Sequence, residues 1–259
     1  FGGYNRYLVA SKLWNKISKI PKPGKSVLAY LIKSLKPTVW DKISDLLYKN
    51  KYSNLGYKLH KGADSLQSKN IDDLYFNLIS TIKNPTEWLV NSEEHSNKNY
   101  NFDPKISEIE RMMIKDLVGY LPTDILTKVD RTSMAVSLEA RTPFLDKEIV
   151  KFALTLPLEY KIKAEVGKSV LRDVLYKYVP KDMIERPKMG FGVPLAEWMR
   201  GELRVWCEDL LNEKKLNDDG FFNSKLIREK WNEHLKGDVD WHHELWNVLI
   251  FQAWLENNR

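Results

Sequence analysis

The sequence predicts a mainly α-helical fold. Apolar residues recur at the three- and four-residue intervals of a helix along most of the 259 residues. Strict alternation of apolar and polar residues, which marks a half-buried strand, is nearly absent, so we expect few strands. Proline and glycine mark short connections, and roughly ten helices are expected between them.

The expected helices follow one another along the chain. Asn70 should cap the second, because its side chain can accept a hydrogen bond from the first turn. Asp103 and Pro104 should open the third, because proline suits the first helical position. Asn, Ser and Glu residues at 91–103 predict a mobile loop. The apolar faces that carry these helices lie at residues 27–35, 74–82, 106–117, 149–153, 170–175, 195–203, 226–231 and 245–250.

Composition excludes an integral membrane protein. Hydrophobic residues make up 43% and charged residues 29% of the chain, as in globular proteins. No window approaches the roughly 20 apolar residues of a membrane span. The chain begins at Phe1 and shows no charged-then-apolar targeting segment, so we expect a cytoplasmic piece of a longer protein.

Basic residues are concentrated near the start of the chain. Residues 1–62 hold 13 Lys and Arg against two Asp, a net charge of +11, within a whole-chain charge of +6. Such a segment is typical of proteins that bind nucleic acid, an anionic membrane surface or an anionic substrate. A solvated basic face that aids solubility is the other interpretation.

The sequence indicates no metal site. The adjacent His242 and His243 would point about 100° apart on a helix, which makes a poor chelate. The single cysteine, Cys207, excludes an internal disulfide and a cysteine-rich zinc site. It lies at helical spacing from Leu203 and Leu210, so we expect a buried thiol.

Charged residues interrupt an apolar run between residues 120 and 146. Burying several charges costs free energy unless they pair or form hydrogen bonds. The cluster therefore predicts either a structural network of ion pairs or a binding site for a charged ligand. Its members are Asp124, Lys128, Asp130, Arg131, Glu139 and Arg141.

A second unusual stretch is the glycine-containing loop at residues 184–194. Two glycines flank an aromatic residue and permit close approach of a ligand, while Arg186 and Lys188 add two cations. Such cations suit phosphate or pyrophosphate, although an exposed basic loop would have the same composition. Lys168 follows a glycine where a helix should begin, a position at which a nearby anion would explain a cation.

Four motifs in this sequence resemble the synthetase domain of glutamine-dependent asparagine synthetases. Their order and spacing match that family from Phe1 to about Arg204. The E-A-R-x-P-F-L-D pattern is long and highly specific. The motifs are F-G-G-Y at 1–4, K-V-D-R-x-S-M-A-x-S-L-E-A-R-x-P-F-L-D at 128–146, G-K-x-x-L-R at 167–172 and R-P-K-x-G-F-G-V-P at 186–194.

The resemblance implies a fold and a reaction. Residues 1–259 would form the C-terminal helical portion of an adenine-nucleotide α-hydrolase-like synthetase domain, of the ATP-pyrophosphatase type. With ATP and Mg²⁺, this domain adenylates the side-chain carboxylate of aspartate and releases pyrophosphate. Ammonia, supplied from glutamine by an N-terminal glutaminase domain, then displaces AMP to give asparagine. A homodimer is a further expectation, and no membrane or nucleic-acid partner is expected.

Site residues are carried over one by one. Lys188 matches the family lysine that contacts phosphate and the adenylated intermediate, and is the expected catalytic residue. Asp124 matches a position linked to the amino-acid substrate, and Lys168 and Arg186 are expected to contact substrate as well. The remaining charges are expected to organise the fold around the site by pairing; they are Asp130, Arg131, Glu139 and Arg141.

Two segments of the family pattern are missing from this sequence. The family's ATP-binding S-G-G-x-D-S loop and its acidic S-G-E-G-x-D-E segment do not occur here, so we expect a C-terminal fragment. Three alternatives stay open. They are amidation of another carboxylate, such as a sugar acid in polysaccharide synthesis, a basic nucleic-acid-binding module built on residues 1–62, and a non-catalytic interaction domain.

The 259-residue chain by itself is predicted to be inactive, because it lacks the family's ATP-binding loop. An assay of pyrophosphate release with ATP, aspartate and ammonia should give only the background rate. Turnover above that of a Lys188→Ala control would contradict this prediction.

Overall fold

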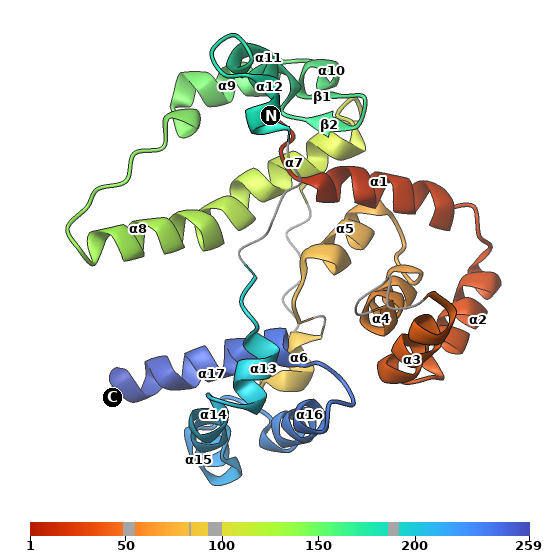
Figure 1. The fold of residues 1–259 in the computed structure, drawn as a ribbon, viewed down its shortest axis with the longest axis vertical. Helices are drawn as coiled ribbons and strands as arrows, with labels where there is room; N and C mark the ends of the chain where they lie inside the picture. Colours follow the sequence, from red (N-terminus) through yellow and green to blue (C-terminus); the bar gives the residue numbers. More distant parts are fainter. Residues whose placement is uncertain (49–54, 83, 93–99, 186–191) are drawn as a thin grey trace. The chain divides into compact units, whose positions relative to one another are not determined.

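The computed structural model describes residues 1–48, 55–82, 84–92, 100–185 and 192–259 (Figure 1). Helices dominate, and the strands within this part of the chain form one short antiparallel pair, so the predicted mainly α-helical class is confirmed. Of the loop predicted at 91–103, residues 93–99 lie outside the described part. None of the described helices has both the length and the apolar character needed to cross a bilayer.

The chain divides into two compact units. Unit 1 comprises Phe1–Lys19, Asn70–Tyr75 and Tyr100–Met189, and unit 2 comprises Ile20–Lys69, Phe76–Asn99 and Gly190–Arg259. Helix α5 (Ile71–Ile79) contributes residues to both units.

Unit 1 joins long helices to a small hairpin. Its α-helices are α1 (Asn5–Ile17), α7 (Glu108–Val118), α8 (Thr127–Met134), α9 (Lys147–Thr155), α10 (Leu158–Lys161), α11 (Ser169–Leu175) and α12 (Lys181–Ile184). Its strands are β1 (Ile162–Lys163) and β2 (Val166–Gly167), paired through Ile162 with Gly167 and Lys163 with Val166. A π-helical segment, Leu121–Leu126, joins α7 to α8, and the three form one nearly continuous rod (Figure 1).

Unit 2 is built from helices in its described part, together with an isolated antiparallel bridge between Leu89 and Phe222. Its helices are α2 (Lys22–Lys33), α3 (Pro37–Tyr48), α4 (Leu55–Ser65), α6 (Pro85–Trp88), α13 (Leu195–Arg200), α14 (Arg204–Leu210), α15 (Glu213–Asp219), α16 (Ser224–Lys236) and α17 (His242–Asn257). Its main apolar core lies among α13 to α17 and α6, around the fully buried Trp231, Leu245 and Leu249. Residues of the predicted faces at 226–231 and 245–250 supply this core.

Of the two helix starts predicted from the sequence, at Asn70 and at Pro104, the first is confirmed and the second is wrong. Asn70 caps α5 as predicted, and its Oδ1 accepts a hydrogen bond from the Asp73 N–H at 2.8 Å. Helix α7, however, begins at Glu108 and not at Pro104. Its N-cap is Ser107, which exchanges hydrogen bonds with Glu110 in a capping box, each at 3.3 Å. This reciprocal pair satisfies two backbone donors that a start at Pro104 would leave without such a cap.

Helix α2 forms where the 27–35 periodicity predicts it, but its apolar face does not enter a core. Val27 is 59% exposed, Tyr30 73% and Leu31 56%, while the buried residue of the helix is Ala29. Periodicity specifies which residues share a face of a helix, and it does not specify which face is packed.

The thiol of Cys207 is buried, as the sequence predicts, and lies in the apolar core of unit 2. Burial, and then the negative charge of Glu208, raise the pKa of this thiol to about 11. Because the thiolate is the reactive form, native protein at pH 8 should resist a thiol reagent such as 5,5′-dithiobis(2-nitrobenzoate). One thiol per chain should react once urea unfolds the protein. Fast reaction of the native chain would contradict the burial of Cys207.

Candidate functional site

Three of the four sequence motifs meet at the first residues of the chain. The ring of Phe1 packs edge-on against Phe144 of the second motif, with centroids 6.2 Å apart. The carbonyl oxygen of Phe1 accepts a hydrogen bond from the backbone N–H of Lys168, in the third motif, at 3.0 Å. The fourth motif falls largely on residues 186–191, outside the described part. The structure therefore gathers motifs separated by more than 100 residues into one place in unit 1.

Glycine is required at this junction. A Cβ on Gly167 would collide with the carbonyl oxygen of Gly2, and backbone atoms cannot move aside as a flexible side chain can. A Cβ on Gly3 would instead displace the side chain of Lys168, which crosses it. Gly2 itself has φ of +65°, a conformation that glycine adopts without strain. The junction thus depends on the absence of side chains on both chain segments.

Lys168 projects from the end of the hairpin. It lies between β2 and α11 in the left-handed region, with φ of 60°, and its side chain is exposed. Such a conformation is uncommon for a residue with a side chain. An exposed ammonium group beside the backbone of Gly3 suits contact with a phosphate or carboxylate. Lys168 is the candidate cation of the described site.

Asp124 lies on the π-helical segment and forms an ion pair with Lys128, one turn later, at 2.9 Å. The Asp124 side chain keeps 39% of its surface exposed. Burial, and then the charge of Asp124, raise the pKa of the nearby Tyr120 hydroxyl. The ring of Tyr120 packs edge-on against that of Tyr4, with centroids 6.0 Å apart. Asp124 is therefore connected to residue 4, just as Lys168 is connected to residues 1–3.

Arg6 fixes this tyrosine pair. Its guanidinium lies 4.2 Å from the ring centroid of Tyr4 and 4.6 Å from that of Tyr120, which are cation–π distances. It also donates a hydrogen bond to Oδ2 of Asp116 at 2.5 Å. The same oxygen accepts a bond from the Tyr7 hydroxyl at 2.6 Å. Asp116 is buried on α7 and Arg6 lies on α1, so this contact joins the two helices.

Three polar atoms around the buried carboxylate of Asp116 make no hydrogen bond to a described residue. Within the described residues, Oδ1 of Asp116, Nε of Arg6 and the Tyr75 hydroxyl are buried without a hydrogen-bond partner. Burial, and then the bond to Asp116, hold the pKa of Tyr7 far above its ordinary value, so its hydroxyl stays a donor. We call Arg6, Tyr7, Tyr75 and Asp116 the Asp116 cluster.

The cluster was not predicted from the sequence, whose apolar pattern marked a different face of α7. The sequence places Ile109, Met113 and Leu117 on the inner face of α7, whereas Met112 and Asp116 are its most buried residues. That Asp116 follows Met112 on the buried side of α7 is visible only in the structure. Which residue pairs with Asp116 depends on α1, more than 100 positions away.

The other predicted charges lie at the surface. Glu139 and Arg141 pair with each other at 2.8 Å, with 67% and 83% of their side chains exposed. Asp130 and Arg131, on α8, are exposed and form no ion pair with any described residue. The described contacts are thus local pairs and do not join into a continuous network. Arg186 and Lys188 lie outside the described residues.

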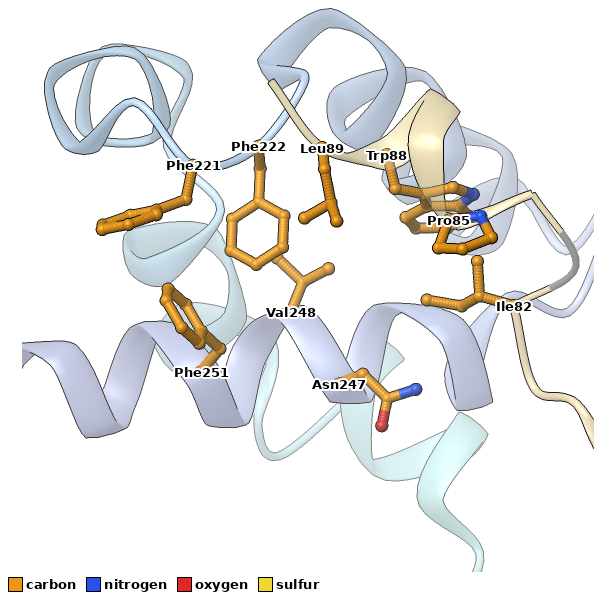
Figure 2. A pocket seen from close by; sticks show the side chains of 9 residues that line it. All are labelled: Ile82, Pro85, Trp88, Leu89, Phe221, Phe222, Asn247, Val248 and Phe251. Carbon is orange, nitrogen blue, oxygen red and sulfur yellow. The ribbon is translucent and has the colours of Figure 1, made fainter. Parts of the chain in front are cut away.

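Unit 2 contains a separate apolar pocket of about 300 Å³ (Figure 2). Leu89, Phe221 and Phe222 face it from one side, and Val248 and Phe251 of α17 face it from the other. Asn247 supplies the one amide among its lining residues, and no lining residue is charged, so the pocket suits neither ATP nor a carboxylate. The remaining lining residues are Ile82, Pro85 and Trp88.

The residues that the structure describes contain no candidate metal site. No group of three or more His, Cys, Asp or Glu side chains among them is placed to hold an ion. At the start of α17, Nδ1 of His242 lies 3.1 Å from Oδ1 of Asp240. The rings of His242 and His243 are tilted relative to each other, with centroids 3.9 Å apart.

Comparison with known proteins gives a consistent result. A family model described as asparagine synthase matches residues 1–256. Glutamine-hydrolysing asparagine synthetase 1 of Bacillus subtilis is 33% identical over 148 residues, 57% of this chain and 23% of that protein. A putative glutamine-hydrolysing asparagine synthetase of Mycobacterium tuberculosis is 37% identical over 147 residues, 56% of this chain and 22% of that protein. The chicken glutamine-hydrolysing enzyme is 29% identical over 155 residues, 54% of this chain and 27% of that protein.

The matched region covers about a quarter of the length of these relatives. No solved structure matched the chain.

The Asp116 cluster is predicted to stabilise unit 1. Asp116→Ala removes the acceptor of Arg6 and Tyr7 and should lower the free energy of unfolding by about 3 kcal/mol, since a broken buried pair leaves its partner unsatisfied. Glu165→Ala is the matched control, because its ion pair with Lys12 is 2.5 Å long but more than half exposed. It should cost at most about 1 kcal/mol. Urea unfolding followed by circular dichroism measures both, and equal losses would contradict the role given to Asp116.

Proposed function

The chain belongs to the asparagine synthase family, and on that basis we propose that the whole protein is an ATP-dependent amidotransferase. It activates the side-chain carboxylate of aspartate and transfers ammonia derived from glutamine to give asparagine. The observation that carries the proposal is the match of the family model to residues 1–256. The convergence of three family motifs around residues 1–4 in unit 1 supports it.

The chemistry proceeds in two balanced steps. A carboxylate oxygen of aspartate attacks the α-phosphorus of ATP, and the bond to pyrophosphate breaks. Ammonia then attacks the acyl carbon, AMP leaves with the bonding electron pair, and a proton is lost from nitrogen. Adenylation is needed because oxide is a poor leaving group, whereas AMP is a good one.

The chain's own residues have distinct roles in this proposal. Lys188 neutralises charge that moves onto pyrophosphate, and Arg186 adds a second cation on the same loop. Lys168 contacts a phosphate or carboxylate oxygen from beside Gly3, where its exposed ammonium fits an anion. Asp124 holds the ammonium group of the amino-acid substrate.

The supporting groups and partners are part of the same proposal. Mg²⁺ would neutralise charge on the phosphates of ATP when bound, and no described residue of this chain is assigned to it. A glutaminase domain supplies the ammonia, and we propose a cytoplasmic homodimer. Asp130, Arg131, Glu139 and Arg141 are proposed to organise the fold around the site, Glu139 and Arg141 by pairing with each other.

Lys188→Ala in the full-length protein tests the catalytic assignment. The rate of asparagine formation should fall about a hundred- to thousandfold, as for loss of one preorganised electrostatic contact. Glutaminase activity and the circular dichroism spectrum should stay near wild type. Lys188→Arg should rescue poorly, because a planar guanidinium does not reproduce the geometry of an ammonium group.

Lys168→Ala tests the second cation. Its matched control is Lys163→Ala, because Lys163 is an exposed lysine on the same hairpin. It should leave the rate unchanged, whereas Lys168→Ala should lower it. If Lys188→Ala keeps the wild-type rate, the catalytic assignment is wrong. Pyrophosphate release with a uronic acid, and none with aspartate, would replace aspartate by a sugar acid as the acceptor.

A further inference from the structure

Helix α2 turns an apolar face to solvent. Val27, Tyr30 and Leu31 lie on one side of the helix and are each more than half exposed. At helical spacing, Lys22 and Lys33 fall toward the side of the buried Ala29, with Lys33 one turn after Tyr30. On that side Lys33 forms an ion pair with Asp64 of α4. Both lysines are themselves exposed. The outward surface of this helix therefore combines apolar side chains with flanking cations, whereas a surface helix usually turns its apolar residues to the core.

The surroundings of this helix are strongly basic. Residues 20–69, which form α2, α3 and α4, contain ten Lys and three Asp, a net charge of +7. On α3, Leu46 is 84% exposed and Lys42 is exposed as well. Exposed apolar side chains within a field of one sign indicate a partner that is both apolar and oppositely charged.

We propose that the α2 face, defined by Val27, Tyr30 and Leu31, docks on an anionic membrane surface. An interfacial helix lies in the plane of the bilayer with its apolar side chains among the headgroups and its lysines on the other face. Tyrosine suits this depth because its ring is apolar and its hydroxyl is polar. The helix is about 10 Å thick, so its lysines remain within roughly one Debye length of the lipid charges.

Charge and geometry favour a membrane over two other occupants. A second copy of the chain would bring a like charge of +7 against this surface, which opposes association. A nucleic acid needs cations and stacking rings on the same face to reach phosphates and bases together. Tyr30 is the one aromatic residue of α2, so the exposed side of this helix offers mainly aliphatic groups and no series of rings for stacking. This inference does not depend on the proposed amidotransferase activity.

A fluorescent label at position 30 tests the docking directly. Cys207 is buried and its thiol has a raised pKa, so Tyr30→Cys provides a single accessible thiol for an environment-sensitive dye in the intact chain. Vesicles of equimolar phosphatidylglycerol and phosphatidylcholine should shift the emission to shorter wavelength, and pure phosphatidylcholine should not. The same dye on Val205→Cys, an 83% exposed site on α14, should show no shift.

Co-sedimentation with the same vesicles tests the apolar face. The double variant Val27→Glu, Leu31→Glu should bind at least about tenfold more weakly, because it removes two apolar groups from the interface. Val205→Glu, which adds a negative charge at a more exposed valine on α14, should weaken binding much less. Circular dichroism checks the fold of each variant.

Three results would overturn the proposal. The first is failure of the wild-type chain to bind the anionic vesicles, and the second is equal weakening by the α2 and Val205 variants. The third is a shift of the dye's emission to shorter wavelength in the absence of lipid, caused by dimer formation or by added DNA. Loss of vesicle binding with unchanged amidotransferase activity would leave the proposed function standing.

Discussion

The bond between Arg6 and the buried carboxylate of Asp116 is the interaction on which the described site depends. The guanidinium of Arg6 neutralises Asp116 and at the same time lies over the rings of Tyr4 and Tyr120. Removing Arg6 would leave the carboxylate of Asp116 buried without its cation, which is costly. Helices α1 and α7 are thereby held in one register. Residues 1–4 and the segment that carries Asp124 depend on that register.

Close backbone approach is the second constraint. Gly2 and Gly167 permit the start of the chain to lie against the hairpin, and Lys168 then extends across Gly3. A catalytic site must hold its charged groups to within a fraction of an ångström, and packed backbone supports this better than loops do. The motifs shared with asparagine synthetases therefore combine residues that would touch substrate with residues that only allow the approach.

The two units present different chemistry. Unit 1 contains the exposed ammonium of Lys168 and the carboxylate of Asp124, which suit small charged substrates. Unit 2 contains an apolar pocket and the outward apolar face of α2, in a basic segment. The features that suit a small charged substrate and the features that suit an apolar partner thus belong to different units.

The sequence by itself determined the helical class, the cap at Asn70, the burial of Cys207 and the family. Periodicity and side-chain chemistry act over one or two turns, and the family motifs are strings of adjacent residues, so all of these can be read locally. Tertiary structure alone decided that Asp116 meets Arg6, that Gly167 meets Gly2 and that the apolar face of α2 points outward. Each of these depends on which distant segment packs where, and a local pattern carries no information about its partner.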